Sequence, residues 1–131
     1  MALSKTSRAV SWVFQIVMVV ILVQTLFFKF TGSPESVYIF TKVGMEPWGR
    51  YGSGVAELLA SILLLIPHRA AYGALLAVFV MLGAIGSHLT QLGIVVQDDG
   101  GLLFGMALTV FISGLIVLAL RRRSLPILSK T

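Results

Sequence analysis

Three ionisable side chains, Lys29, Glu57 and His88, stand inside or at the ends of long apolar stretches of this chain. A carboxylate beside an ammonium or an imidazole can form an ion pair, hydrogen-bond a ligand or pass a proton. Ionisable residues within apolar membrane segments normally face the interior of a helix bundle and have a partner there. These three residues are therefore the first candidates for a functional site, provided that the surrounding elements bring them together.

The composition indicates an integral membrane protein. Of the 131 residues, 57% are hydrophobic and only 11% are charged, whereas soluble domains carry about 25% charged residues. The chain has no cysteine, which excludes thiolate catalysis, disulfide exchange and cysteine-bound metal within it. The net charge of +5 comes from basic residues that flank apolar segments, so we expect membrane lipid, and no nucleic acid, as their partner.

Four apolar segments have the length of helices, at residues 11–30, 51–66, 70–92 and 101–120. The first is longer than a signal-peptide core and suits a membrane-spanning helix. After it, Ser33, Pro34 and Glu35 are typical of a helix start, and a weak apolar stripe predicts a short amphipathic helix over residues 34–43. We expect an all-α fold in one domain over residues 1–131, namely a membrane four-helix bundle with the short helix at the membrane interface.

The distribution of charge predicts the topology. With four spans, both termini and the turn at residues 67–69 lie on one side, which has seven basic residues and no acidic one. The positive-inside rule places this side in the cytoplasm, and we expect the bacterial inner membrane as the location. The opposite, outer side has three basic residues and all five acidic residues of the chain, Glu35, Glu46, Glu57, Asp98 and Asp99.

This topology brings polar groups from several helices into the outer half of the bundle. Glu57 lies six residues into the second span, about 9 Å from its outer end. Lys29 is next to the outer end of the first span, and His88 is one turn from that of the third. We expect the inner half to contain almost no polar groups. The predicted site is a cluster of Lys29, Glu57 and His88, surrounded by Thr25, Ser53, Gln91 and Tyr51.

Two interpretations of this cluster are open. In the structural one, Lys29 and Glu57 form an ion pair that holds the bundle together, with His88 hydrogen-bonded alongside. In the functional one, the cluster lines a pocket for a small ligand. A quinone fits this chemistry, because Lys29 or His88 could donate to a carbonyl and Glu57 could relay a proton. With one histidine inside the membrane and no fixed ligand spacing, we expect no metal site.

Small residues repeat every four positions in the last segment. Such a stripe allows two helices to approach closely in a membrane. We expect the stripe to pack inside the bundle, and the alternative is a homodimer contact through the same face. Its members are Gly101, Gly105, Thr109 and Ser113.

A set of short motifs also points to a family. The motifs are Phe28-Lys29-Phe30 at the end of the first segment, the turn Phe40-x-x-x-Gly44-x-x-Pro47, the entry Gly52-Ser53-Gly54 into Ala56-Glu57-Leu58-Leu59, and Ser87-His88 in the third segment. Together they resemble the DoxX-like family of small four-helix membrane proteins, over roughly residues 10–118. The resemblance implies that Lys29, Glu57 and His88 occupy polar positions of the family. Some relatives are linked to thiosulfate:quinone oxidoreductase as a membrane subunit, others to oxidative-stress complexes, and distant ones resemble assembly or trafficking factors.

Three functions follow from the residues and the resemblance. The first is a small membrane subunit of a redox or stress-related system, which binds a quinone-like or lipid ligand and works with a soluble redox partner. The second is a non-catalytic membrane scaffold or assembly factor. The third is a small proton-coupled transporter, motivated by Glu57 alone. The residues leave open whether the protein is an enzyme, because no complete catalytic constellation is recognisable.

Overall fold

The computed structural model describes residues 4–122, and every regular element within them is helical. The all-α class predicted from the sequence is confirmed. A 3-10 turn, η1 (Pro67–Arg69), precedes the fourth α-helix, and a π-helical turn, η2 (His88–Leu92), extends it. Arg123 and Lys130, which contributed to the predicted basic side, lie outside the described residues. The α-helices are α1 (Lys5–Thr31), α2 (Pro34–Lys42), α3 (Trp48–Leu64), α4 (Ala70–Ser87) and α5 (Leu102–Leu120).

Local capping explains where the first two helices begin and end. α1 begins six residues before the predicted start. The Ser4 side chain accepts a hydrogen bond from Ser7 N and so caps the helix, which lets the polar residues ahead of the apolar run join it. It ends where Gly32 adopts the left-handed conformation, with φ 67°. α2 begins as the sequence indicated, with Ser33 as its cap and Pro34 at its first position.

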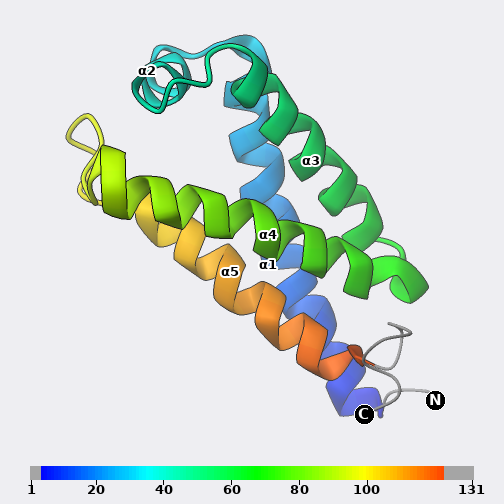
Figure 1. Ribbon diagram of the computed structural model, residues 1–131. Coiled ribbons are helices and arrows are strands. Elements are labelled where there is room, and N and C mark those ends of the chain that lie inside the picture. Colours follow the sequence, from blue (N-terminus) through cyan, green and yellow to red (C-terminus); the bar gives the residue numbers. More distant parts are fainter. Residues whose placement is uncertain (1–3, 123–131) are drawn as a thin grey trace.

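The four long helices form a closed bundle. α1 packs against α3 and α5, and α4 packs against the same two helices. Figure 1 shows α2 and the loop before α5 at one end of the bundle, and the start of α1 with the end of α5 at the other. We call these the α2 end and the terminal end.

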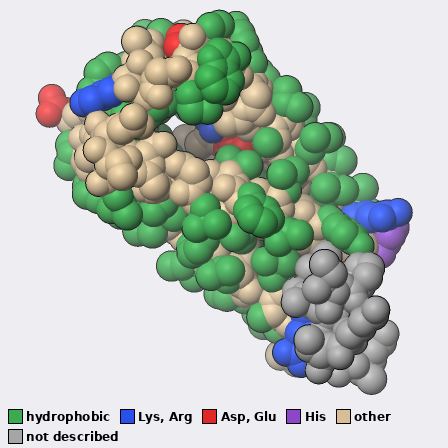
Figure 2. Space-filling view, viewed as in Figure 1, with side chains coloured by type: hydrophobic (Ala, Val, Ile, Leu, Met, Phe, Trp, Pro, Cys, Tyr) green, Lys and Arg blue, Asp and Glu red, His purple; other side chains and the backbone are tan. Residues whose placement is uncertain are grey.

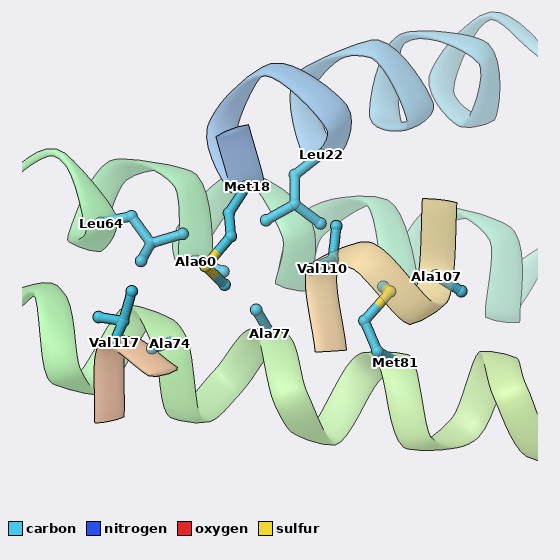
Figure 3. Close-up of a cluster of buried hydrophobic side chains, with 10 residues drawn as sticks. All are labelled: Met18, Leu22, Ala60, Leu64, Ala74, Ala77, Met81, Ala107, Val110 and Val117. Atoms are coloured by element: carbon cyan, nitrogen blue, oxygen red, sulfur yellow. The ribbon is translucent and has the colours of Figure 1, made fainter. Parts of the chain in front are cut away.

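Between the two ends lies an apolar core (Figure 3). On α1 the buried positions recur every three or four residues, at Ser11, Gln15, Met18 and Leu22, so one face of the helix is turned inward. That face is apolar in its middle and polar toward both ends. The core side chains are Met18, Leu22, Ala60, Leu64, Ala74, Ala77, Met81, Ala107, Val110 and Val117.

A glycine on α4 allows the closest approach between two helices. A Cβ on Gly73 would lie 2.7 Å from Leu64 N and 2.8 Å from Ala60 O, which are backbone atoms of α3. Because backbone atoms cannot swing aside as a side chain can, this position requires glycine.

On α5, by contrast, the predicted stripe is turned partly outward. Gly105 and Thr109 are exposed, and nothing lies within 4 Å of a Cβ built on Gly105. Gly101 precedes the helix, and Ser113 is the buried member. The expectation that the whole stripe packs inside the bundle is therefore wrong. The close contact is made by Gly114, one residue beyond the stripe, and a homodimer through the exposed part stays a prediction.

Three helical segments are long and apolar enough to cross a membrane, namely α1, Pro67–Leu92 and α5. α3 has 17 residues, which is shorter than the roughly 20 that usually span a bilayer. The predicted fourth span is therefore not confirmed. α2 forms over nearly the predicted residues, and its place at a membrane interface stays a prediction.

Asp99 organises the loop before α5. Its carboxylate accepts hydrogen bonds from Val96 N at 3.0 Å, Gly101 N at 2.8 Å and Leu103 N at 3.1 Å. Burial by itself would raise the pKa of this carboxyl, but the three backbone bonds and the nearby His88 together hold the pKa below its ordinary value of 3.8. The charged form of Asp99 is thus the form that supports the start of α5.

We expect Asp99→Ala to destabilise the protein by about 1–2 kcal/mol at neutral pH, as the loss of a helix cap does. Because the pKa of Asp99 is lowered in the folded state, its contribution is present above the ordinary value of 3.8 and is lost as the pH falls through the lowered value. Denaturant unfolding at neutral and strongly acidic pH measures this difference. Asp98→Asn, which removes an exposed neighbouring carboxylate and keeps a residue type that tolerates the φ of 60° at this position, is the control. The same acid sensitivity in Asp99→Ala as in the natural protein would contradict the assignment.

Candidate functional site

A buried ion pair joins α1 and α3 near the α2 end. Glu57 is 1% exposed, and its Oε1 pairs with Lys29 Nζ. Its Oε2 accepts a hydrogen bond of 2.7 Å from Thr25 Oγ1. The Lys29 side chain keeps 17% exposure, and its ammonium lies 5.8 Å from the centre of the Phe40 ring. Both carboxylate oxygens therefore have a partner, whereas the ammonium, with three donors, has hydrogens left for another acceptor.

Helical spacing explains why these side chains meet. Thr25 and Lys29 are four residues apart and share one face of α1. On α3, Glu57 follows Gly54 by three residues and so lies on the same face. A Cβ on Gly54 would lie 2.9 Å from Phe30 Cε1, so the missing side chain lets the end of α1 approach α3. The glycine therefore brings Lys29 within reach of Glu57.

Arg50 is a residue of this region whose role the sequence did not indicate. It is 6% exposed, and its Nε donates to both carboxylate oxygens of Glu46, at 2.8 and 3.0 Å. Its Nη1 donates to the backbone carbonyl of Lys29, which lies in the last turn of α1 and also accepts a long hydrogen bond of 3.4 Å from Gly32 N. Arg50 thus fixes the end of α1 that carries Lys29. The sequence feature that could have predicted this ion pair is the spacing of four residues between Glu46 and Arg50.

His88 is buried but does not join the ion pair as the structural interpretation expected. Its Nδ1 lies 2.8 Å from Gly93 O, and since a carbonyl oxygen only accepts, Nδ1 carries the hydrogen. The ring packs edge-on against Phe104, with 5.4 Å between ring centres. The π-helical turn accounts for this, because it bonds Gly93 N back to His88 O and folds the two residues together. Among residues 4–122, no hydrogen bond joins His88 to Lys29 or Glu57.

All three predicted residues nevertheless line one cavity, together with Thr25 and Ser53. The cavity has a volume of about 1010 Å³. It is bounded by α2 and by the parts of α1, α3, α4 and α5 that lie toward the α2 end. Figure 2 shows an opening at this end, with acidic and basic side-chain atoms visible inside it. The wall is otherwise largely apolar and includes the rings of Phe28, Phe40, Trp48 and Phe79.

Two of the predicted neighbours lie outside this cavity. Gln91 is exposed and is not part of the wall. Tyr51 is exposed as well, and its ring lies against the Arg50 guanidinium at 4.4 Å. Ser53, which does line the cavity, donates its hydroxyl to Arg50 O at 3.3 Å. Within the part of the chain that the structure describes, no three His, Asp or Glu side chains gather closely enough to hold a metal ion.

A second buried polar cluster lies at the terminal end. Arg121 Nε donates to Ser11 Oγ at 2.7 Å and to Gln15 Oε1 at 2.9 Å, and Arg121 Nη1 donates to Pro67 O at 3.1 Å. Gln15 Nε2 in turn donates to Leu64 O at 2.6 Å. The expectation of an almost apolar inner half is therefore wrong. Ser11 and Gln15 are neutral and stand within an apolar run, so the distribution of charge in the sequence did not point to them. Arg121 comes next to them only in the folded bundle.

The fold and the site define a small, all-helical protein with membrane-length apolar helices and an ion pair in the wall of a cavity at one end. The chain belongs to the DoxX-like family, whose family model matches residues 13–115, well over half of its length. No curated protein and no solved structure matches the chain. Family membership and the three apolar helices together indicate a membrane protein.

Proposed function

We propose that the protein is a small membrane subunit of a redox or stress-related system, and that it binds a quinone-like or lipid ligand in the cavity at the α2 end. The observation that carries this proposal is the position of the Lys29–Glu57 pair in the wall of a cavity of about 1010 Å³. Ligand sites are typically concave, about 300–1,000 Å³ in volume, and mostly apolar with a few fixed polar groups. A ligand with an apolar body and a polar head suits this combination.

Lys29 is the residue expected to hold a carbonyl of the ligand. Glu57 engages one donor of its ammonium, and the others are free to turn toward the cavity. The hydrogen bond from Thr25 keeps the second carboxylate oxygen occupied, so Glu57 holds Lys29 in place without competing for the ligand. The aromatic rings of the wall can pack against a flat ring in offset or edge-on geometry.

His88 is expected to act differently from the donor that the sequence suggested. In the neutral tautomer that carries its hydrogen on Nδ1, where Gly93 O accepts it, Nε2 is an acceptor. An acceptor suits the hydroxyl of a reduced quinone better than the carbonyl of an oxidised one. Lys29 and His88 would therefore favour different redox forms of the same ligand.

We place the protein in the bacterial inner membrane with the terminal end in the cytoplasm. The described basic residues at that end are Lys5, Arg8, Arg69, Arg121 and Arg122, and all acidic residues of the chain belong to the opposite half. The positive-inside rule supports this orientation. The cavity would then face the outer leaflet, where an apolar ligand could enter from the bilayer and a soluble redox partner could approach.

Trp48 offers a direct test, because it lines the cavity, whereas the second of the two tryptophans, Trp12, lies near Arg121 at the terminal end. We expect a short-chain quinone analogue to quench Trp48 fluorescence saturably in Trp12→Phe protein. The matched Trp48→Phe protein, which keeps Trp12, should show only the linear quenching of a quinone dissolved in the detergent micelle. Linear quenching in both variants would contradict ligand binding at the cavity.

A non-catalytic scaffold or assembly factor is the second candidate, and the closed polar network favours it. Both oxygens of Glu57 have partners, and Arg50 ties the end of α1 to α3. These contacts would stabilise the bundle whether or not a ligand binds. An ion pair that stabilises the protein, together with purely linear quenching of Trp48, would favour the scaffold.

Proton-coupled transport, the third function considered, loses support in the structure. On the inward face of α1, Met18 and Leu22 separate Gln15 from Thr25, and these two polar residues are about 15 Å apart along the helix axis. Buried apolar side chains of α3, α4 and α5 surround this stretch (Figure 3). The polar side chains that are buried beside this stretch are those of Ser61 on α3, which donates to Glu57 O, and Ser113 on α5. Among residues 4–122, the side-chain hydrogen bonds do not form a continuous chain between the two ends, as a proton path would require.

A further inference from the structure

The polar cluster at the terminal end contains one atom that the fold leaves unsatisfied. Arg121 is 8% exposed, and its buried Nη2 has no hydrogen-bond partner among residues 4–122. Nε and Nη1 are held by Ser11, Gln15 and the carbonyl of Pro67, so the planar guanidinium is fixed in one orientation. A buried donor on a charged group is costly to leave unpaired. The guanidinium is therefore held in one orientation with one buried donor that lacks an acceptor among residues 4–122.

No carboxylate side chain of the chain is placed to supply that acceptor. All five acidic residues belong to α2, to α3 or to the loops at the α2 end. On α3, Glu57 lies seven residues before Leu64, about 10 Å along the helix axis, and it is engaged by Lys29 and Thr25. The partners that Arg121 does have are neutral. Within the described part of the chain, the buried charge of Arg121 therefore has no counter-charge.

A second cation makes this end more attractive to an anion. Burial lowers the pKa of the Arg121 guanidinium, and the like charge of the nearby Arg8 lowers that pKa further, so an anion that binds Arg121 would also be attracted by Arg8. Trp12 lies with its ring centre 6.0 Å from the Arg121 guanidinium. Tryptophan is enriched where membrane helices meet the lipid head groups.

We propose that Arg121, assisted by Arg8, binds a phosphate group, namely that of an anionic phospholipid at the terminal end of the bundle. The guanidinium fork matches phosphate oxygens in geometry and charge. An anion that reached Nη2 would lie in a partly dry place, where an ion pair is stronger than in water. Near this end α1 and α5 expose apolar side chains, including Val13 on α1 and Leu115 on α5. The acyl chains of a lipid can lie against these side chains. The site lies at the opposite end from the cavity and is independent of its ligand.

Native mass spectrometry of the full chain, released from a neutral detergent, tests this proposal. The probes are dioleoyl phosphatidylglycerol, dioleoyl phosphatidylcholine with the same acyl chains, and inorganic phosphate. We expect the natural protein to retain phosphatidylglycerol over phosphatidylcholine by about tenfold or more, as expected for one or two arginines at an anionic head group. Arg121→Gln should abolish the preference. Arg122→Gln, which removes the same charge from the exposed neighbour, should leave it intact.

Arg121→Gln also removes contacts to Ser11, Gln15 and Pro67, so a variant that does not touch this network is included. Arg8 is exposed, and Arg8→Gln should fold normally and weaken the preference for phosphatidylglycerol. The absence of any preference in the natural protein, or an equal loss in Arg122→Gln, would overturn the proposal. Displacement of phosphatidylglycerol by inorganic phosphate at millimolar concentration would support the phosphate site and assign it to a soluble ligand.

Discussion

Lys29→Met should destabilise the protein by about 3–5 kcal/mol, because the change leaves a buried carboxylate without its counter-charge. Glu57 is 1% exposed, so its carboxylate is largely shielded from water when the ammonium is removed. Glu57→Gln should cost less than Lys29→Met. The Lys29 side chain is 17% exposed, and its long stem can carry the ammonium toward the surface.

The double change, Lys29→Met with Glu57→Gln, should destabilise the protein by less than the sum of the single changes. Denaturant unfolding in mixed micelles, followed by circular dichroism, provides the four free energies of the cycle. Thr25→Val is the reference for a lost hydrogen bond to the same carboxylate and should cost about 1–3 kcal/mol. Additive single effects would show that Lys29 and Glu57 do not stabilise each other.

Much of the arrangement around Glu57 could be predicted from the sequence. Apolar runs gave the long helices, and Ser33 with Pro34 gave the start of α2. Counting residues inward from the charged ends placed Lys29 and Glu57 in the same outer half of the bundle, and the cost of a lone membrane carboxylate required a partner. The structure pairs these two residues and adds Thr25.

The partner of His88 and the cluster around Arg121 could not be predicted in the same way. The His88 side chain forms a hydrogen bond with Gly93 O because the chain forms a π-helical turn there. No residue pattern in the sequence predicted that turn. Arg121 looked like one of several flanking cations until the fold brought it to Ser11 and Gln15, more than 100 positions away in sequence. Contacts of this kind depend on how the helices rotate about their axes.

The stripe of small residues on α5 illustrates the same limit. A spacing of four residues shows that Gly105 and Thr109 share a face, but not that this face is turned inward. Which face of a helix turns inward depends on all the side chains that the face carries. On α5 the buried side chains include those of Val110 and Val117, with Gly114 on the same face. Gly114 then allows the contact with α4, where a Cβ would lie 2.7 Å from Val78 Cγ2.

Narrowing the cavity while leaving the ion pair intact should weaken ligand binding. Gly83 lines the cavity, and nothing lies within 4 Å of a Cβ built on it. Gly86, on the same helix, also has nothing within 4 Å, but it is not part of the cavity wall. Gly83→Phe and Gly86→Phe thus form a matched pair. Neither new side chain meets a packed neighbour at its Cβ, so both variants should fold, and only the first should place a ring at the cavity wall and narrow the cavity.

The central claim is that the cavity beside Lys29 and Glu57 holds an apolar ligand with a polar head. Lipid extraction and mass spectrometry of protein purified in mild detergent test it most directly. We predict that a quinone or a related ligand is enriched over bulk membrane lipid in the natural protein and in Gly86→Phe, and falls by about tenfold or more in Gly83→Phe, equivalent to at least about 1.4 kcal/mol of binding free energy. No enrichment in the natural protein, or equal retention by Gly83→Phe, would contradict the claim.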